Sequence, residues 1–347
     1  MTCGNIAFLG SGETSLAGGR IFEQLARQIS APLRIAVLET PAGFELNSGQ
    51  VAGKVAEFFK TRLGNYKPQV DVIPARKKAS AFSPDDPEIC APLLNANLIF
   101  MGPGSPTYAI RQLQGSLAWD IIRARHRLGA TLVFASAATI AVGAFGLPVY
   151  EIYKVGLDVQ VVPGLDFFAD FYTPLSIVPH WNNTDGGAEV DTSRCFIGME
   201  RFSEWCGQLP AGHTVLGLDE HTGIILDFAE RQCQVVGVSS VSLVRECDPQ
   251  IHPSGARFPL SVIGPLLEPE SASSGIPADV WALVSNIGGS AAPQDQSPPE
   301  QVLAFAEARQ AARARKDWAA SDEFRRKIAD LGWTVQDTAQ GWKLIKS

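Results

Sequence analysis

Short apolar runs alternate with stretches of helical spacing along the first part of the chain. Five of these runs have the length and composition of buried strands. They are Ile6–Leu9, Arg34–Leu38, Val70–Ile73, Leu98–Met101 and Thr131–Phe134. Strands that alternate with helices predict a mostly parallel sheet with helices on both faces. We therefore expect an α/β fold, a three-layer sandwich with its active site at the carboxyl ends of the strands.

The pattern changes after residue 150. A strand is expected at Leu175–Val178, followed by a helix at Asp191–Cys206. Further apolar runs with turn residues between them predict antiparallel strands. These runs are Val215–Leu218, Ile224–Phe228, Val235–Val238 and Ser242–Val244.

The composition divides the chain into three parts. Residues 1–264 form the α/β domain, and residues 265–298, rich in Pro, Ser, Gly, Ala and Gln, are expected to be a linker with a short helix at Ala278–Ile287. Residues 299–347 form a small helical module, with helices at 300–316 and 318–331 and a hairpin at 334–344. Residues 300–347 hold nine Lys and Arg against seven Asp and Glu, which leaves 20 against 29 and a charge of −9 for residues 1–299. This acidic balance argues against nucleic acid as the partner of the large domain.

Two features of the sequence bear on where in the cell the protein is expected to be. Residues 128–150 carry no charge, but Ser136, Gly143 and Pro148 interrupt them, so we interpret them as a buried strand, a turn and a helix start, with no membrane partner. The six cysteines form no CxxC pair, and the N-terminus has no basic segment of the kind that begins a signal peptide. A cytoplasmic protein without disulfides is expected.

A serine follows the fifth expected strand, in Phe134-Ala135-Ser136-Ala137-Ala138. A serine on a sharp turn between a strand and a helix can present its hydroxyl as a nucleophile, although the usual pattern is G-x-S-x-G. The alternative is a buried serine at the start of a helix of small residues. The loop Gly102–Pro106 follows the fourth strand, and the N–H groups of Gly104 and Ala137 are candidates for an oxyanion hole. Here the alternative is a simple turn before a helix.

His180 comes just past the strand Leu175–Val178, after Pro179, and is the preferred general base. A structural role for this histidine is the alternative. His221 is the competitor, because it also follows a strand and lies next to Glu220. We expect His126 to be solvated, and His213 and His252 to lie in loops.

A triad needs an acid that orients the histidine. Glu220 is the preferred acid, Glu151 is its rival, and Asp219 is expected to be structural. No histidine pair has metal-ligand spacing, and Gly10-Ser11-Gly12-Glu13 lacks the third glycine of a dinucleotide fingerprint. Neither a metal nor a cofactor is expected.

The order of several segments resembles the dipeptidase E and cyanophycinase family of serine peptidases. The segments are IAFLGSGE at 6–13, VLETPAGFE at 37–45, LIFMGPGSPTYAIRQL at 98–113, VFASAAT at 133–139, PVYEIYKVG at 148–156, SIVPHW at 176–181 and GLDEHTGI at 217–224. The resemblance implies the class I glutamine amidotransferase-like, flavodoxin-like fold. It also implies a nucleophile elbow at Ser136.

The resemblance assigns further roles. His180 falls on the base and Glu220 on the acid of the cyanophycinase type, while Glu151 lies near an acid of dipeptidase E. Gly104 and Ala137 match the oxyanion hole. Substrates of the family tend to carry aspartyl groups, so contacts with substrate are expected from Ser105, Tyr108, Arg194 and Arg201, although both arginines also suit a solvated helix face.

The chain departs from the family at two places. The family elbow is G-T-S-A-G-A, whereas Phe134 and Ala138 replace both glycines here. The sequence WNNTDGG at 181–187 stands where cyanophycinase is rich in arginine, which disfavours cyanophycin as substrate.

The end of the chain, residues 308–344, is similar to the C-terminal region of cysteinyl-tRNA synthetase. Its motif is ARQAARARKDWAASD followed by DTAQG. Contact with RNA or with a protein partner is one interpretation. The preferred one is a helical hairpin packed through Trp318, Phe324, Leu331 and Trp333, with its charges solvated.

Three functions are compatible with these observations. The first is a serine-type hydrolase of small peptides or amides, expected to be a homo-oligomer, with Ser136, His180 and Glu220 as a triad. The second is an inactive binding protein of the same fold whose tail contacts a partner. A glutamine amidotransferase is the least favoured, because that chemistry uses a cysteine where Ser136 stands.

Overall fold

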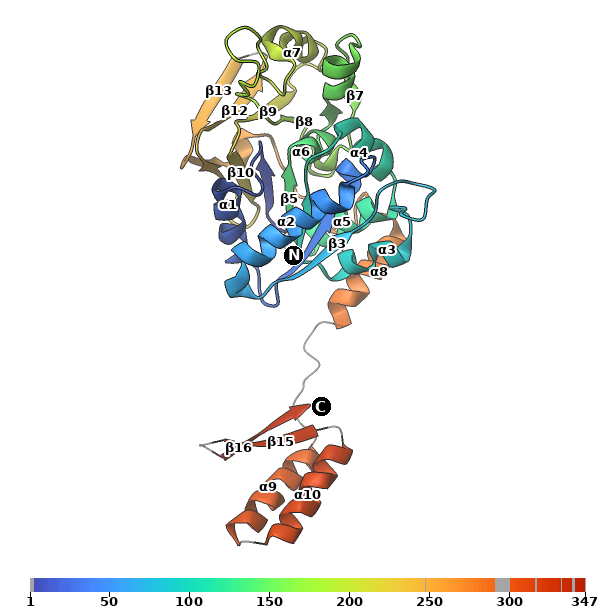
Figure 1. Ribbon diagram of the computed structural model, residues 1–347, viewed down its shortest axis with the longest axis vertical. Helices are drawn as coiled ribbons and strands as arrows, with labels where there is room; N and C mark the ends of the chain where they lie inside the picture. The colour runs from blue at the N-terminus through green and yellow to red at the C-terminus, as the bar shows by residue number, and fades with distance from the viewer. Residues whose placement is uncertain are drawn as a thin grey trace. The chain divides into compact units, whose positions relative to one another are not determined.

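The computed structural model describes residues 3–246, 248–290, 300–315, 317–331, 333–338 and 341–346. Contacts divide the chain into two compact units, Met1–Ile287 and Gly288–Ser347, which are described separately (Figure 1). The helix α8 (Ala278–Ser290) ends just beyond this division. The boundaries at 264 and 298 stay predictions.

An eight-stranded sheet forms the centre of the first unit, with the strand order β14-β11-β10-β1-β5-β4-β2-β3. Its five parallel strands are β1 (Ile6–Leu9), β2 (Arg34–Leu38), β3 (Gln69–Ile73), β4 (Leu98–Met101) and β5 (Thr131–Ala135). Three antiparallel strands extend it beyond β1, namely β10 (Thr222–Asp227), β11 (Gln232–Gly237) and β14 (Arg257–Pro259). The predicted α/β fold is confirmed.

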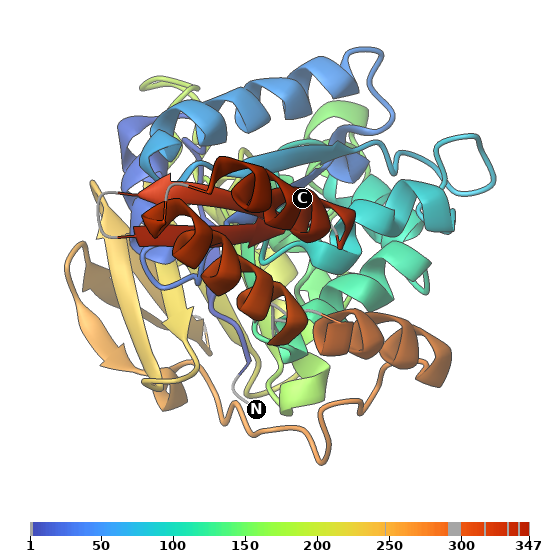
Figure 2. The same ribbon diagram turned by 90° about the horizontal axis from the view of Figure 1, so that it is seen from below.

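The side chains of each central strand point alternately to the two faces of the sheet, and each face has its own hydrophobic core. In β1, Phe8 faces a cluster that contains residues of α5 (Leu117–Arg127) and α8, whereas its neighbour Leu9 faces α1 (Leu16–Ala26) and α2 (Ser48–Arg62). Successive strand side chains point to opposite faces, so each apolar strand serves both cores. The result is the predicted three-layer sandwich (Figure 1, Figure 2).

The first unit contains a second sheet of four strands, one of which is β8 (Leu175–Val178), the strand that precedes His180. The strands lie in the order β13 (Asp248–Pro253), β12 (Ser240–Arg245), β9 (Thr214–Leu218) and β8. Strands β8 and β9 are parallel, and the other pairs are antiparallel. The unit also contains the short helices α3 (Pro87–Cys90), α4 (Pro106–Leu113) and α6 (Ala137–Ala141) and the strand pair β6 (Phe145–Gly146) and β7 (Val162–Pro163).

The helix expected at 191–206 begins later than predicted. Helix α7 covers only Gly198–Gly207, because Arg194, Cys195 and Phe196 have φ values of 57°, 60° and 69°. Three consecutive left-handed residues cannot continue a right-handed helix.

The prediction that His126 is solvated is wrong. Its side chain is fully buried, with ring contacts to Phe167, Phe171 and Phe228 and a 2.8 Å hydrogen bond between Nε2 and the carbonyl of Gly4. Burial lowers the pKa of His126 to about 3.

The uncharged stretch 128–150 is divided among β5, α6 and β6. No helix in the described part of the chain is long and apolar enough to cross a membrane. Cys3, Cys90, Cys195 and Cys233 form no disulfide, and Cys247 lies outside the described residues.

The second unit contains the predicted two helices and hairpin. These are α9 (Glu300–Ala314), α10 (Trp318–Asp330) and the antiparallel strands β15 (Trp333–Thr338) and β16 (Gly341–Lys346). Its core is built from Val302, Ala306, Ile328, Trp333 and Val335. The prediction that Trp318 and Leu331 pack this core is wrong, because they are 58% and 44% exposed.

Candidate active site

Ser136 lies on a strained turn between β5 and α6. Its φ and ψ are 50° and −120°, a conformation that non-glycine residues rarely adopt. A strained turn at the end of a strand is the backbone on which a nucleophile elbow is built, and that role of Ser136 stays a prediction. Phe134 causes no crowding, because its ring is buried in the core below and stacks on Phe8 with centroids 5.7 Å apart. Ala138 is also fully buried, so both glycine replacements are accommodated.

His180 follows β8 and faces Ser136. Its Nε2 lies 2.9 Å from Oγ of Ser136, and its Nδ1 lies 3.0 Å from Oε1 of Glu220. A carboxylate only accepts hydrogen bonds, so Nδ1 carries the proton and Nε2 is left to accept from the serine hydroxyl. The structure brings Ser136, His180 and Glu220 within hydrogen-bond distance of one another, and their role as a triad stays a prediction.

Two asparagines hold Glu220, and sequence reasoning missed both. Asn183 donates a 3.0 Å hydrogen bond to Oε1 of Glu220, and the backbone N–H of Glu220 donates to Oδ1 of Asn182. Burial raises the pKa of Glu220, but the hydrogen bonds from Asn183 and His180 outweigh it and leave that pKa below its ordinary value. The only signal was the polar pair directly after His180 and Trp181.

The competing residues lie elsewhere. The ring of His221 faces Gly12, where a Cβ would lie 2.3 Å from its Nδ1. Asp219 is buried and accepts hydrogen bonds from Ser239 and Ser240. His213 pairs with Ser176, and His252 stacks on Phe258.

Glu151 belongs to a separate hydrogen-bonded chain. Thr107 donates a 2.6 Å hydrogen bond to Oε1 of Glu151 and lies 3.1 Å from Oγ of Ser105. Ser105 also caps α4 by accepting from the N–H of Tyr108. Among the described residues, Glu151 makes no hydrogen bond to His180.

The two candidate oxyanion-hole residues lie in the turn before α4 and at the first position of α6. Gly104 has a φ of 144°, and a Cβ there would lie 2.0 Å from the carbonyl oxygen of Pro41, so only glycine fits. Ala137 is the first residue of α6, where N–H groups have no partner within the helix. Their joint role stays a prediction.

The residues that were expected to contact substrate make other interactions or lie at the surface. The hydroxyl of Tyr108 donates to the carbonyl of Arg76. The guanidinium of Arg194 lies 4.0 Å from the ring centroid of Trp181 and donates to the carbonyl of the same residue. Arg201 is exposed on α7. Substrate binding by these residues and by Ser105 stays a prediction.

The left-handed turn at 194–196 supports the candidate base. The N–H of Cys195 donates to the carbonyl of His180, which itself has a φ of 48°. The ring of Phe196 packs against the imidazole with centroids 5.3 Å apart. This turn therefore covers one side of His180 and fixes its backbone.

The first unit is similar to the crystal structure of a peptidase from an acI-B1 actinobacterium. The similarity has a TM-score of 0.60 at 19% identity and covers 74% of this chain and 97% of the other. The chain shares the fold of that peptidase. At this identity the similarity concerns the fold alone.

The second unit matches a different family. A family model described as the cysteinyl-tRNA ligase anticodon binding domain matches residues 297–342. Cysteine–tRNA ligases of Methanosarcina mazei and Methanosarcina acetivorans are 39% and 49% identical over 70 and 49 residues. The predicted similarity of this segment is confirmed. The chain spans only 14% and 10% of the length of these two relatives.

Proposed function

We propose that the chain is a serine hydrolase that cleaves a peptide or amide bond. The observation that supports this proposal is the line of hydrogen bonds from Ser136 through His180 to Glu220, with distances of 2.9 and 3.0 Å. A hydroxyl paired with an oriented imidazole is the minimal arrangement for nucleophilic acyl transfer.

In the proposed reaction, Oγ of Ser136 attacks the carbonyl carbon while Nε2 of His180 takes the hydroxyl proton. The N–H groups of Gly104 and Ala137 stabilise the negative oxygen of the tetrahedral intermediate. His180 then protonates the leaving amine, which departs and leaves an ester on Ser136. Water, deprotonated by His180, hydrolyses this ester and restores the enzyme. Glu220 keeps the imidazole in the required tautomer and stabilises its charged form.

Covalent labelling tests the proposal. A fluorophosphonate should phosphonylate Ser136 with loss of fluoride, and mass spectrometry should locate the adduct there. Ser136→Ala should remove both labelling and amide hydrolysis. Ser203→Ala, which alters a serine on α7, is the matched control and should keep both. Full hydrolysis by Ser136→Ala would exclude the proposed nucleophile.

A panel of dipeptides addresses the substrate. The preference for aspartyl peptides and the homo-oligomeric state are predictions from the sequence. Comparison of Asp-Leu with Asn-Leu and Ala-Leu would measure the first, and light scattering of the full chain would measure the second.

We propose RNA contact by the second unit as a second function. The specific observation in its favour is Trp318, which is 58% exposed at the start of α10 with the Arg313 guanidinium 5.8 Å from its ring centroid. An exposed aromatic ring beside a cation suits the stacking of an unpaired base. The family model matched at residues 297–342 is named for anticodon binding, which makes tRNA the first RNA to test.

Filter binding of the full chain to unfractionated tRNA tests this second function. Trp318→Ala should weaken binding about 5- to 100-fold, as expected for loss of one base stack. Phe82→Ala, an exposed aromatic residue of the first unit, should not weaken it. Equal affinity of the wild type and Trp318→Ala would argue against RNA contact at this residue. RNA binding without labelling of Ser136 would favour the alternative of an inactive binding protein.

A further inference from the structure

A cavity of about 550 Å³ lies in the first unit away from the triad. Its wall contains three prolines and three alanines, together with the rings of Phe145 and Tyr172. Its volume is in the range of small-molecule sites, and its wall is mostly apolar with a few polar groups, which is typical of such sites. Neither Ser136, His180 nor Glu220 lines it.

His213 is one of the polar residues of this wall, and it is uncharged. It is 6% exposed, and its Nε2 lies 2.9 Å from Oγ of Ser176. Because the hydroxyl of Ser176 donates to the carbonyl of Phe145, His213 must donate its Nε2 proton to Ser176. Nδ1 is therefore an acceptor, and it has no partner among the described residues. Burial lowers the pKa of His213, which keeps it neutral.

Asp166 supplies the acid of the wall. It has a left-handed backbone with a φ of 47°, and it forms no ion pair with any residue that the structure describes. The Asp166 side chain is exposed at this wall. Partial desolvation of its carboxyl and the neighbouring Asp170 raise its pKa, and a backbone hydrogen bond from Ala169 offsets part of this effect. No lysine or arginine lines the cavity, so its carboxylate has no cation of the protein within this space.

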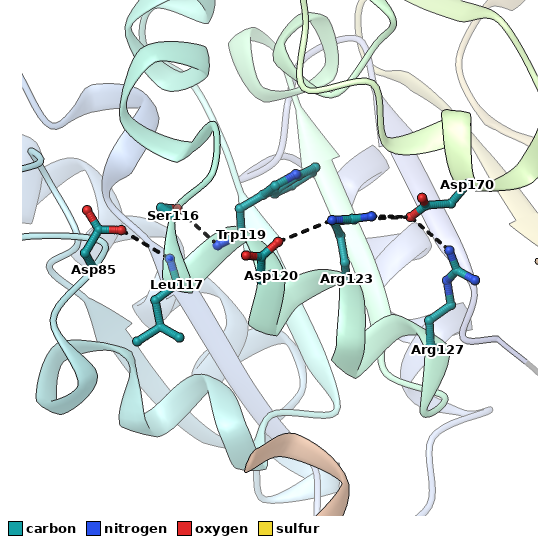
Figure 3. Close-up of polar contacts among 8 residues, drawn as sticks. All are labelled: Asp85, Ser116, Leu117, Trp119, Asp120, Arg123, Arg127 and Asp170. Atoms are coloured by element: carbon teal, nitrogen blue, oxygen red, sulfur yellow. Dashed lines mark hydrogen bonds and ion pairs between the residues drawn. The ribbon is translucent and has the colours of Figure 1, made fainter. Parts of the chain in front are cut away.

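The segment that carries Asp166 is held rigidly. A short 3₁₀ helix, η5 (Phe167–Phe171), separates Asp166 from Tyr172. Figure 3 shows Asp170 of this segment between two arginines of α5, with Arg123 at 2.7 Å and Arg127 at 2.9 Å. Gly275 packs directly against this network, since a Cβ there would lie 2.5 Å from Oδ1 of Asp170. The cavity wall is therefore preformed.

We propose that this cavity binds a small organic ammonium ion with an apolar body. The ammonium group pairs with the exposed Asp166 carboxylate, and the ring of Tyr172, which is 54% exposed in the same wall, can contact the cation. The proline and alanine side chains enclose the apolar body. An anionic ligand is disfavoured because no lysine or arginine lines the space, and a purely apolar ligand would gain no attraction from the carboxylate.

Fluorine NMR of the full chain with 4-fluorophenethylamine tests the proposal. We expect saturable binding of this amine and at least tenfold weaker binding of 2-(4-fluorophenyl)ethanol, which has the same body without the charge. Asp166→Asn should weaken amine binding at least tenfold and keep the fold, since asparagine tolerates a left-handed backbone. Asp158→Asn, at an exposed acid outside the cavity, is the matched control and should bind as the wild type.

Two further variants locate the bound amine. Ala169→Trp fills the cavity from an exposed position of its wall and should abolish binding, with circular dichroism confirming the fold. Ser136→Ala should bind normally, because Ser136 lies outside the cavity. Absence of saturable binding by the folded wild type would overturn the proposal. Unchanged binding by Asp166→Asn and Ala169→Trp, or loss of binding in Ser136→Ala, would overturn it equally.

Discussion

The side-chain amide of Asn183 donates a 3.0 Å hydrogen bond to Oε1 of Glu220. The same oxygen lies 3.0 Å from Nδ1 of His180, so Asn183 and His180 fix one carboxylate oxygen between them. Both bonds favour the charged carboxylate and lower its pKa against the effect of burial. Asn183 therefore acts on the candidate triad through Glu220 and is a positioning residue.

Replacing Asn183 should change the titration of Glu220. Asn183→Ala removes one donor to the charged form, so we expect the pKa of Glu220 to rise in carbon-13 NMR titrations. The lowered pKa of Glu220 stabilises the fold above the ordinary glutamate pKa, and this contribution is lost as the pH falls through the folded value. The variant should therefore lose more stability near neutral pH than in strong acid, where the loss of the bond from the N–H of Asp185 to Oδ1 of Asn183 remains. Asn47→Ala, an exposed residue, is the control. An unchanged Glu220 titration would contradict the role of Asn183.

Two glutamine variants distinguish the acids. Glu220→Gln removes the charge that orients His180 and should lower kcat for amide hydrolysis about 10²- to 10⁴-fold. Glu151→Gln should keep kcat within about tenfold of the wild type, because Glu151 bonds to Thr107 and not to His180. Steady-state kinetics with one amide substrate would measure both. The opposite ranking would assign the role of the acid to Glu151.

Phe196 should affect the rate more than substrate binding. Phe196→Ala removes the ring that covers one side of His180, and we expect kcat to fall about tenfold with little change in KM. Phe196→Leu should recover part of the rate, because it restores bulk beside the imidazole. Tyr153 contacts Phe196 and is exposed, so Tyr153→Ala is a suitable control. A selective rise in KM would instead indicate that Phe196 contacts substrate.

The layers of the fold were predictable because short runs of consecutive apolar residues indicate strands that are buried on both faces. Phe8 and Leu9 are adjacent apolar residues, and only a strand buried on both faces places them in two separate cores. Ser136 and His180 were each singled out because they lie just past an expected strand, but nothing in the sequence indicated that these strands, β5 and β8, belong to two different sheets. The two sheets meet at this point, where the N–H of His180 donates to the carbonyl of Gly10 just past β1.

Other parts of the site had no usable sequence signal. The left-handed turn contains Arg194, Cys195 and Phe196 rather than glycine, and such residues adopt this backbone only when tertiary contacts impose it. Asn183 reaches Glu220 across 37 positions of the chain. The second unit shows the same limit: the spacing located its helices, but only packing decides that Trp318 stays at the surface.

The error at His126 has a physical consequence that can be measured. Its partner, the carbonyl of Gly4, is 122 positions away, so local sequence gave no hint of its burial. Burial, aided by Arg127, lowers the pKa of His126 from 6.5 to about 3. Above pH 6.5 the ring of His126 is neutral in both the folded and the unfolded chain, so it adds no pH dependence to the free energy of unfolding. Between pH 6.5 and 3 the unfolded chain binds a proton that the folded chain does not, so the free energy of unfolding falls as the pH is lowered.

Urea unfolding at several pH values tests this dependence. The wild type should lose up to about 1.4 kcal/mol per pH unit below pH 6.5 through this residue. His126→Leu should be less stable at neutral pH, because it loses the bond to Gly4, but its stability should fall less steeply with acid. His221→Leu, which alters an exposed histidine, should retain the slope of the wild type. Parallel slopes for the wild type and His126→Leu would show that His126 does not remain neutral in the folded chain.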